Sequence, residues 1–184
     1  MPKDKNYICA VSVNYVGDIE LPDNLLTIPA YTFYNRTNII NVVIPSTVTS
    51  IGDRAFYGCT SLQSVNLPED LTTLNDYAFY NCIALKSLYY NCLNLGTMSG
   101  KSYCFYRIGY NNRNAEGLTV YIGSEVKKIA DYLFNPAGND DSYRAFITKI
   151  DGSNNNVCTT IGSYAFTSCT YLKEAILPSS ITSI

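Results

Sequence analysis

The sequence predicts an α/β repeat solenoid, in which short units stack along one axis and each buries its apolar face against its neighbours. Three prolines are 23 residues apart: Pro22, Pro45 and Pro68. Three phenylalanines keep the same period: Phe33, Phe56 and Phe79. The phase returns near the C-terminus, where Phe166 precedes Pro178 by 12 residues, as Phe33 precedes Pro45. A fixed period in this range is typical of a solenoid.

The composition supports one elongated domain over residues 1–184, built from about seven units. Hydrophobic residues make up 47% of the chain and charged residues 15%, which is enough apolar material for a continuous core. The net charge of −2 gives no electrostatic footprint for nucleic acid. The chain also lacks the run of about 18 apolar residues that a membrane span requires.

Each unit is expected to begin with a strand that ends at the repeat proline. Residues 62–67 alternate apolar and polar side chains, which is the pattern of a half-buried strand. Pro68 then closes the strand, because proline cannot donate to a continuing ladder. A second apolar pair follows a short turn: Leu71 and Leu74. Residues 76–79 could then form a single helical turn that directs Phe79 inward.

The pattern LPxxLTxIGxxAFxxCxxL closely resembles the BspA-type leucine-rich repeat. Three stretches match it: residues 44–62, 67–85 and 161–178. The second has Leu74-Asn75 in place of Ile-Gly, and the first unit, residues 19–33, has Pro29 in place of the glycine. Arg36 stands where that unit's cysteine belongs. The resemblance implies a right-handed leucine-rich-repeat solenoid with a concave sheet and short helical or irregular convex segments.

Two segments interrupt the period, and we interpret them as insertions near 92–117 and 135–156. The first is rich in Asn, Gly, Ser and Tyr, and residues 118–123 restore the strand after it, with Gly123 at the proline position. Insertions in a solenoid map to loops on one face or edge. These loops either reflect neutral drift in length or contact a ligand.

The seven cysteines fit a reduced core better than a set of disulfides. Three of them lie three residues after a repeat phenylalanine and should stack in one column: Cys59, Cys82 and Cys169. Cys158 takes an aliphatic core position, as expected of a small buried hydrophobe. A disulfide among Cys92, Cys104 and a neighbour is the alternative. The chain has no CxxC pair and no histidine, which disfavours a metal site.

The sequence offers no catalytic constellation and no cofactor site, so we expect no enzymatic activity. Without histidine, neither a Ser-His-Asp nor a Cys-His arrangement is possible. Two carboxylate pairs are adjacent in sequence, Glu69-Asp70 and Asp140-Asp141, and we interpret both as solvated turn residues. No glycine-rich phosphate loop is present.

Residues 151–156, Asp-Gly-Ser-Asn-Asn-Asn, offer oxygen atoms at alternate positions, as a calcium loop does. An EF-hand loop needs a glutamate at its twelfth position, which here is Gly162, so that motif fails. A looser calcium site is the remaining alternative.

The candidate binding residues flank the central apolar residue of each predicted strand and point away from the core. They are Asn41, Val43, Ser64, Asn66, Ser87, Tyr89, Thr119 and Tyr121. The same phase extends this set at both ends: Asp18, Glu20, Glu174 and Ile176. Tyrosine together with asparagine and serine is a good binding composition, because a rigid ring supplies area and amides supply hydrogen bonds. The alternative is that these side chains are merely exposed.

The family resemblance implies a non-catalytic binding or adhesion module of a cell-surface or secreted protein of a bacterium, with a parasitic protist as the alternative source. Its partner would be a host or cell-surface protein or a glycan. Two other functions stay open: a structural spacer that pairs with further repeats of the same protein, and the recognition arm of an enzyme whose catalytic domain lies elsewhere. Ile184 falls in mid-repeat, so we expect the chain to be a piece of a longer protein.

Overall fold

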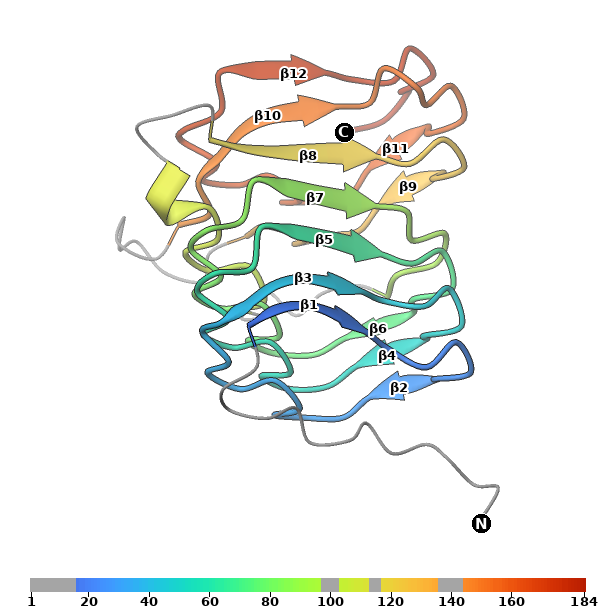
Figure 1. The fold of residues 1–184 in the computed structure, drawn as a ribbon. Coiled ribbons are helices and arrows are strands. Elements are labelled where there is room, and N and C mark those ends of the chain that lie inside the picture. The colour runs from blue at the N-terminus through green and yellow to red at the C-terminus, as the bar shows by residue number, and fades with distance from the viewer. Residues whose placement is uncertain (1–15, 97–102, 113–116, 136–143) are drawn as a thin grey trace.

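The computed structural model describes residues 16–96, 103–112, 117–135 and 144–184, which form one stack of coils. Each coil contributes one strand to a parallel seven-stranded sheet, the long sheet, in the order β1-β3-β5-β7-β8-β10-β12 (Figure 1). Its strands are β1 (Gly17–Glu20), β3 (Ile39–Val43), β5 (Ser64–Leu67), β7 (Ser87–Tyr90), β8 (Leu118–Ile122), β10 (Ile147–Asp151) and β12 (Glu174–Ile176). The architecture is the repeat solenoid that the sequence predicts.

Five two-residue strands form a second layer. Three of them form one sheet: β2 (Thr27–Ile28), β4 (Ser50–Ile51) and β6 (Thr73–Leu74). The other two form a second sheet: β9 (Lys128–Ile129) and β11 (Thr160–Ile161). In Figure 1 these short strands run in the direction opposite to the long ones. The second apolar residue after each turn, such as Leu74, therefore belongs to a strand, which the sequence analysis did not predict.

The core between the two layers contains a column of phenylalanine rings, one per coil. The ring centroids of Phe33 and Phe56 are 5.0 Å apart, as are those of Phe56 and Phe79, and all three side chains are fully buried. The column continues with centroid distances of 5.7, 5.1 and 5.5 Å through Phe105, Phe134 and Phe166. These distances are close to the spacing of about 4.8 Å between neighbouring strands.

The predicted helical turn at residues 76–79 is a hydrogen-bonded turn rather than a helix. Tyr77 has a φ of 58°, in the left-handed region, and Asn81 has a φ of 62°. A right-handed helix cannot include such residues. In the described part of the chain, the single helix is a 3₁₀ turn, Tyr110–Asn112.

The two predicted insertions contain regular parts of the repeat. Within 92–117, Phe105 takes the place of the repeat phenylalanine, and the Phe79 amide donates to the carbonyl of Cys104 at 2.9 Å. Within 135–156, the structure places β10, a full strand of the long sheet. Phe105 and β10 are therefore regular elements of the repeat that lie within the ranges expected to hold the insertions. Residues 97–102, 113–116 and 136–143 lie outside the described residues.

The cysteine column is present. The thiols of Cys59 and Cys82 are buried and donate to the carbonyls of Phe33 and Phe56, at 3.2 and 3.3 Å. Burial raises the pKa of Cys59 to about 12. Cys92 and Cys104 are buried free thiols, so the alternative of a disulfide that joins them is wrong. Cys158 is a buried core residue, as predicted, and Cys169 is half-buried.

Candidate functional site

The eight candidate residues lie on the outer face of the long sheet, as the alternation predicts. The side chains between them point into the core: Val42, Val65, Leu88 and Val120 are buried. Val43 is 61% exposed. Because the strands pair in register, the outward side chains form two rows across the sheet.

The first row is polar and is fixed by direct strand pairing. Asn41 pairs with Ser64, Ser64 with Ser87, and Ser87 with Thr119. At its N-terminal end, the Asn41 amide donates to the Asp18 carboxylate at 2.8 Å. This row therefore presents hydroxyl and amide groups with little charge in its middle.

The second row carries the aromatic pair. Asn66 pairs with Tyr89 and Tyr89 with Tyr121. The rings of Tyr89 and Tyr121 stack with their centroids 4.9 Å apart and an interplanar angle of 12°. Tyr89 is 40% exposed, and the Asn91 amide donates to Asn66 beside it. The pair is a solvent-facing aromatic surface next to amide groups.

A charged group at the C-terminal end of these rows was missed by the sequence analysis. Lys149 pairs with Thr119 on β8 and with Glu174 on β12, and its ammonium lies 3.3 Å from Glu174 and 3.5 Å from Asp151. A hydrogen bond to Glu174 raises the pKa of Lys149. The sequence held a weak signal: Gly152 directly follows β10 as Gly123 directly follows β8, although the strand register places Gly152 one position earlier.

The segment considered for calcium serves as a turn that binds the neighbouring coil. The Asp151 carboxylate accepts from the amide and hydroxyl of Ser153, at 3.1 and 2.6 Å, and these bonds lower its pKa. Buried Asn155 donates to the carbonyls of Gly123 and Val126, at 2.6 and 2.8 Å. Among the described residues, no group of three or more His, Cys, Asp or Glu is placed to hold a metal ion.

Of the candidate carboxylates, Glu69 and Asp70 are exposed turn residues, and Asp140 and Asp141 lie outside the described residues.

A second aromatic surface, which the sequence analysis also missed, lies on the turns between the short and long strands. We call it the tyrosine strip. Its first column is Tyr31, Arg54, Tyr77 and Tyr103, and its second column is Tyr34, Tyr57, Tyr80 and Tyr106. The period of 23 residues in the second column was visible in the sequence between its first three members.

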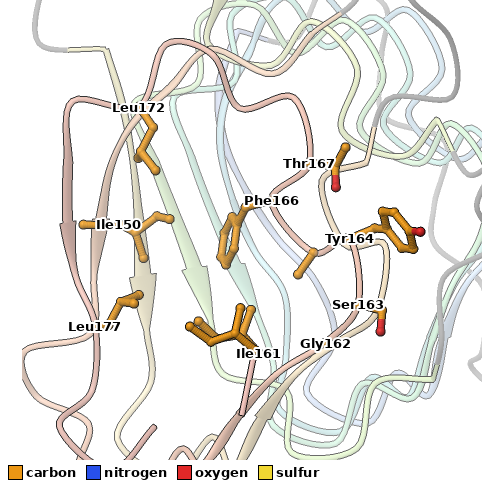
Figure 2. A pocket seen from close by; sticks show the side chains of 12 residues that line it. Ile150, Ile161, Gly162, Ser163, Tyr164, Phe166, Thr167, Leu172 and Leu177 are labelled. Carbon is orange, nitrogen blue, oxygen red and sulfur yellow. The ribbon is translucent and has the colours of Figure 1, made fainter. Parts of the chain in front are cut away.

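An apolar pocket of about 640 Å³ lies at the C-terminal end of the stack. Figure 2 shows Phe166 and Ile161 in its centre, with Ile150 and Leu172 on one side and Tyr164 on the other. Phe166 and Ile161 occupy the core positions of their coil. The pocket is therefore the uncovered face of the last described coils, and we assign no small-molecule ligand to it.

No helix in the described part of the chain has the length and hydropathy that a bilayer crossing needs.

A family model described as BspA type leucine rich repeat region matches residues 11–139 and 142–184, in six copies. The comparison with curated proteins gave no match.

Several solved structures are similar in fold. The leucine rich repeat protein of T. pallidum (TpLRR) is 21% identical, with a TM-score of 0.52 over 84% of this chain and 77% of that one. A leucine-rich repeat protein from Bacteroides ovatus is 22% identical, with a TM-score of 0.56 over 91% of this chain and 44% of that one. The pneumococcal vaccine antigen PcpA is 17% identical, with a TM-score of 0.53 over 91% of this chain and 40% of that one. The chain thus spans less than half of the latter two proteins.

Proposed function

Because the chain belongs to the BspA-type leucine-rich repeat family, we propose that it is a non-catalytic binding module of a surface-displayed or secreted bacterial protein. It recognises a protein or a glycan through the outer face of the long sheet. The observation that carries this proposal is the exposed stack of Tyr89 and Tyr121, with Asn66 beside it. Family membership supports the location and the lack of catalysis.

The mechanism is passive and depends on a preformed surface. Parallel strands fix the backbone of both rows, so the side chains lose little entropy when a partner docks. The stacked rings supply apolar area, while Asn66 and the serine hydroxyls supply hydrogen bonds. Affinity then arises from many modest contacts around one aromatic anchor, and removal of Tyr89 should cost about 1–2 kcal/mol of binding free energy.

The test is binding of the purified chain to an array of glycans and matrix proteins, alongside the variant Tyr89→Ala/Tyr121→Ala. The matched control is Tyr57→Ala/Tyr80→Ala, which removes another stacked pair, 4.7 Å apart, from the tyrosine strip. We expect a partner that the control still binds and the first variant does not. A partner that both variants bind equally well would move recognition away from the stacked tyrosines, for instance to the inserted residues within 92–117 or 135–156. The absence of any partner would favour a spacer.

A second candidate function is assembly with further repeats, and it is supported by the uncovered apolar face in Figure 2. Leu177 is 38% exposed and lines this face. Association that depends on concentration, measured by sedimentation, should weaken in a Leu177→Lys variant and should disappear when a capping repeat is added. An enzyme domain elsewhere in the parent protein is a third hypothesis, which the flanking gene sequence tests.

A further inference from the structure

The tyrosine strip is a continuous surface that extends over four coils. In its second column, the ring centroids are 5.0, 4.7 and 6.1 Å apart from Tyr34 through Tyr106. In its first column, the Arg54 guanidinium lies 4.5 Å from the ring centroid of Tyr77, whose ring stacks at 4.9 Å on that of Tyr103. The strip therefore contains seven rings and one guanidinium, aligned with the axis of the stack.

The rings of the two columns are inclined to each other in the three coils that carry a ring in both columns, and the angle is largest between Tyr103 and Tyr106, at 80°. The ring planes of Tyr31 and Tyr34 form an angle of 55°, and their centroids are 5.6 Å apart. The ring planes of Tyr77 and Tyr80 form an angle of 57°, and their centroids are 5.7 Å apart. A face between two inclined rows of rings can cradle a narrow chain that runs along the axis. Tyr31 and Tyr34 are exposed and Tyr106 is buried, while the other members are half-buried, so most of the rings are held in place with their outer edges accessible.

Backbone geometry sets the first column. Tyr31, Arg54 and Tyr77 have φ values of 59°, 52° and 58°, in the left-handed region, which costs a side chain other than glycine about 1–2 kcal/mol. Hydrogen bonds to the next coil hold this turn: the Tyr31 amide donates to the Asp53 carbonyl at 2.9 Å, and the Arg54 amide to the Asp76 carbonyl at 3.0 Å. The side chains of Tyr31 and Arg54 are therefore presented from turns that the next coil holds in place.

The strip presents apolar ring edges and hydrogen-bond donors, and its one charged member, Arg54, is paired with a carboxylate. Stacking covers the ring faces within a column, so the exposed atoms are ring edges and phenolic hydroxyls, which can donate. Arg54 forms an ion pair with Asp53 and donates to the Tyr31 hydroxyl at 3.2 Å, both through Nη1. The Asp53 carboxylate balances the charge of the Arg54 guanidinium. Neither the ion pair nor the hydrogen bond to Tyr31 uses the Nε or Nη2 atom of Arg54.

We propose that the tyrosine strip binds a proline-rich segment of another polypeptide in the polyproline II conformation. Such a segment is complementary in three respects: its side chains are apolar rings, it lacks charge, and its carbonyls have no internal hydrogen bonds and so accept from hydroxyl donors. The four coils of the strip span three strand spacings of about 4.8 Å each. This length matches about five residues of polyproline II, which rises about 3.1 Å per residue. A sugar would need uncovered ring faces, and a charged partner would need unbalanced charge. This site is separate from the long sheet, so either proposal can fail alone.

The test is isothermal titration of the chain with decaproline, with a glycine-serine peptide of equal length as the reference. We expect decaproline to bind at least about tenfold more tightly than the reference, a difference that corresponds to about 1.4 kcal/mol. Tyr57→Ala/Tyr80→Ala should weaken decaproline binding by about tenfold or more, since it removes two rings. Tyr57→Phe/Tyr80→Phe keeps both rings and should weaken it by about threefold, through lost hydroxyl donors.

Tyr89→Ala/Tyr121→Ala is the matched control and should bind decaproline like the wild type. The Phe variant also guards against misfolding, because it preserves the stack. Equal binding of decaproline and the glycine-serine peptide would overturn the proposal. The proposal would also be overturned if the Ala variant, shown by circular dichroism to be folded, bound decaproline as tightly as the wild type. Displacement of decaproline from the strip by a neutral oligosaccharide would overturn it as well.

Discussion

Substitution of Gly52 by alanine tests how closely the coils are packed. A Cβ atom at this position would lie 2.4 Å from the Ala30 amide nitrogen and 2.7 Å from the Pro29 carbonyl carbon. Both atoms belong to the backbone of the neighbouring coil and cannot rotate away. To restore a carbon contact of about 3.5 Å, the coils would have to separate locally by roughly 1 Å.

The cost follows from what such a separation disturbs. The Gly52 amide donates to the Ile28 carbonyl at 2.8 Å, and the Tyr31 amide donates to the Asp53 carbonyl at 2.9 Å, so both inter-coil bonds would lengthen. Overpacking costs about 1–3 kcal/mol. Each weakened hydrogen bond adds up to about 1 kcal/mol. We therefore expect Gly52→Ala to lower the free energy of unfolding by roughly 2–4 kcal/mol, a large part of the stability of a typical domain.

Urea unfolding followed by far-ultraviolet circular dichroism measures this difference. Gly96→Ala is the matched control, because Gly96 is exposed and its nearest neighbour would be the Thr72 carbonyl oxygen at 3.3 Å. The control should stay within about 0.5 kcal/mol of the wild type. If Gly52→Ala did the same, the coils would have room that the structure does not show, and the reasoning would be refuted.

Three further changes test the core. Asn155→Ala should lower the free energy of unfolding by about 2–4 kcal/mol in urea, since it leaves inter-coil carbonyls unpaired; a loss below about 0.5 kcal/mol would contradict this. Phe79→Ala should cost about 3–5 kcal/mol, because it empties a fully buried position between stacked rings, and an unchanged urea midpoint would argue against the column. Burial raises the pKa of Cys59 to about 12 and that of Cys82 well above its ordinary value. The folded state therefore keeps thiol protons that the unfolded chain loses above about pH 9. Stability should therefore be complete below pH 9 and fall above it, by roughly 1.4 kcal/mol per pH unit for each thiol. Urea midpoints at pH 8 and 10 measure this fall, and Cys59→Ala/Cys82→Ala should reduce it; an equal fall in the variant would exclude these thiols as the cause.

The sequence predicts the long sheet because one-sided burial imposes a visible alternation within each strand and a fixed period between strands. Residues 64–67 illustrate this, since Val65 and Leu67 point inward and their neighbours outward. The short strands contain two residues each, which is too few for an alternation to appear. Phe105 was missed because a change in spacing removes it from the period and Cys104 takes the place of the usual alanine.

The candidate rows could be predicted for the same reason, whereas the tyrosine strip could not. Its first column depends on a left-handed φ at Tyr31 and Tyr77, a conformation that tyrosine rarely adopts and that inter-coil hydrogen bonds impose. Lys149 was missed because a strand was assigned to an insertion. In both cases the decisive information lies in contacts between coils rather than in the residues of one coil.

Stacking of tyrosines is in itself a consequence of the architecture. Tyr89 and Tyr121 lie 32 positions apart in sequence, yet the extra residues precede β8 and leave the strands in register, so the rings meet at 4.9 Å. Tyr57 and Tyr80 meet at 4.7 Å for the same reason, on the turns. A parallel stack at about the strand spacing would form wherever one coil repeats the aromatic residue of another. The stacking distance therefore follows from the fold; the information about a partner resides in the exposure of the stacked rings, their hydroxyl groups and the neighbouring amide or guanidinium groups. Variants that keep the ring and remove the hydroxyl group separate recognition from packing on either surface.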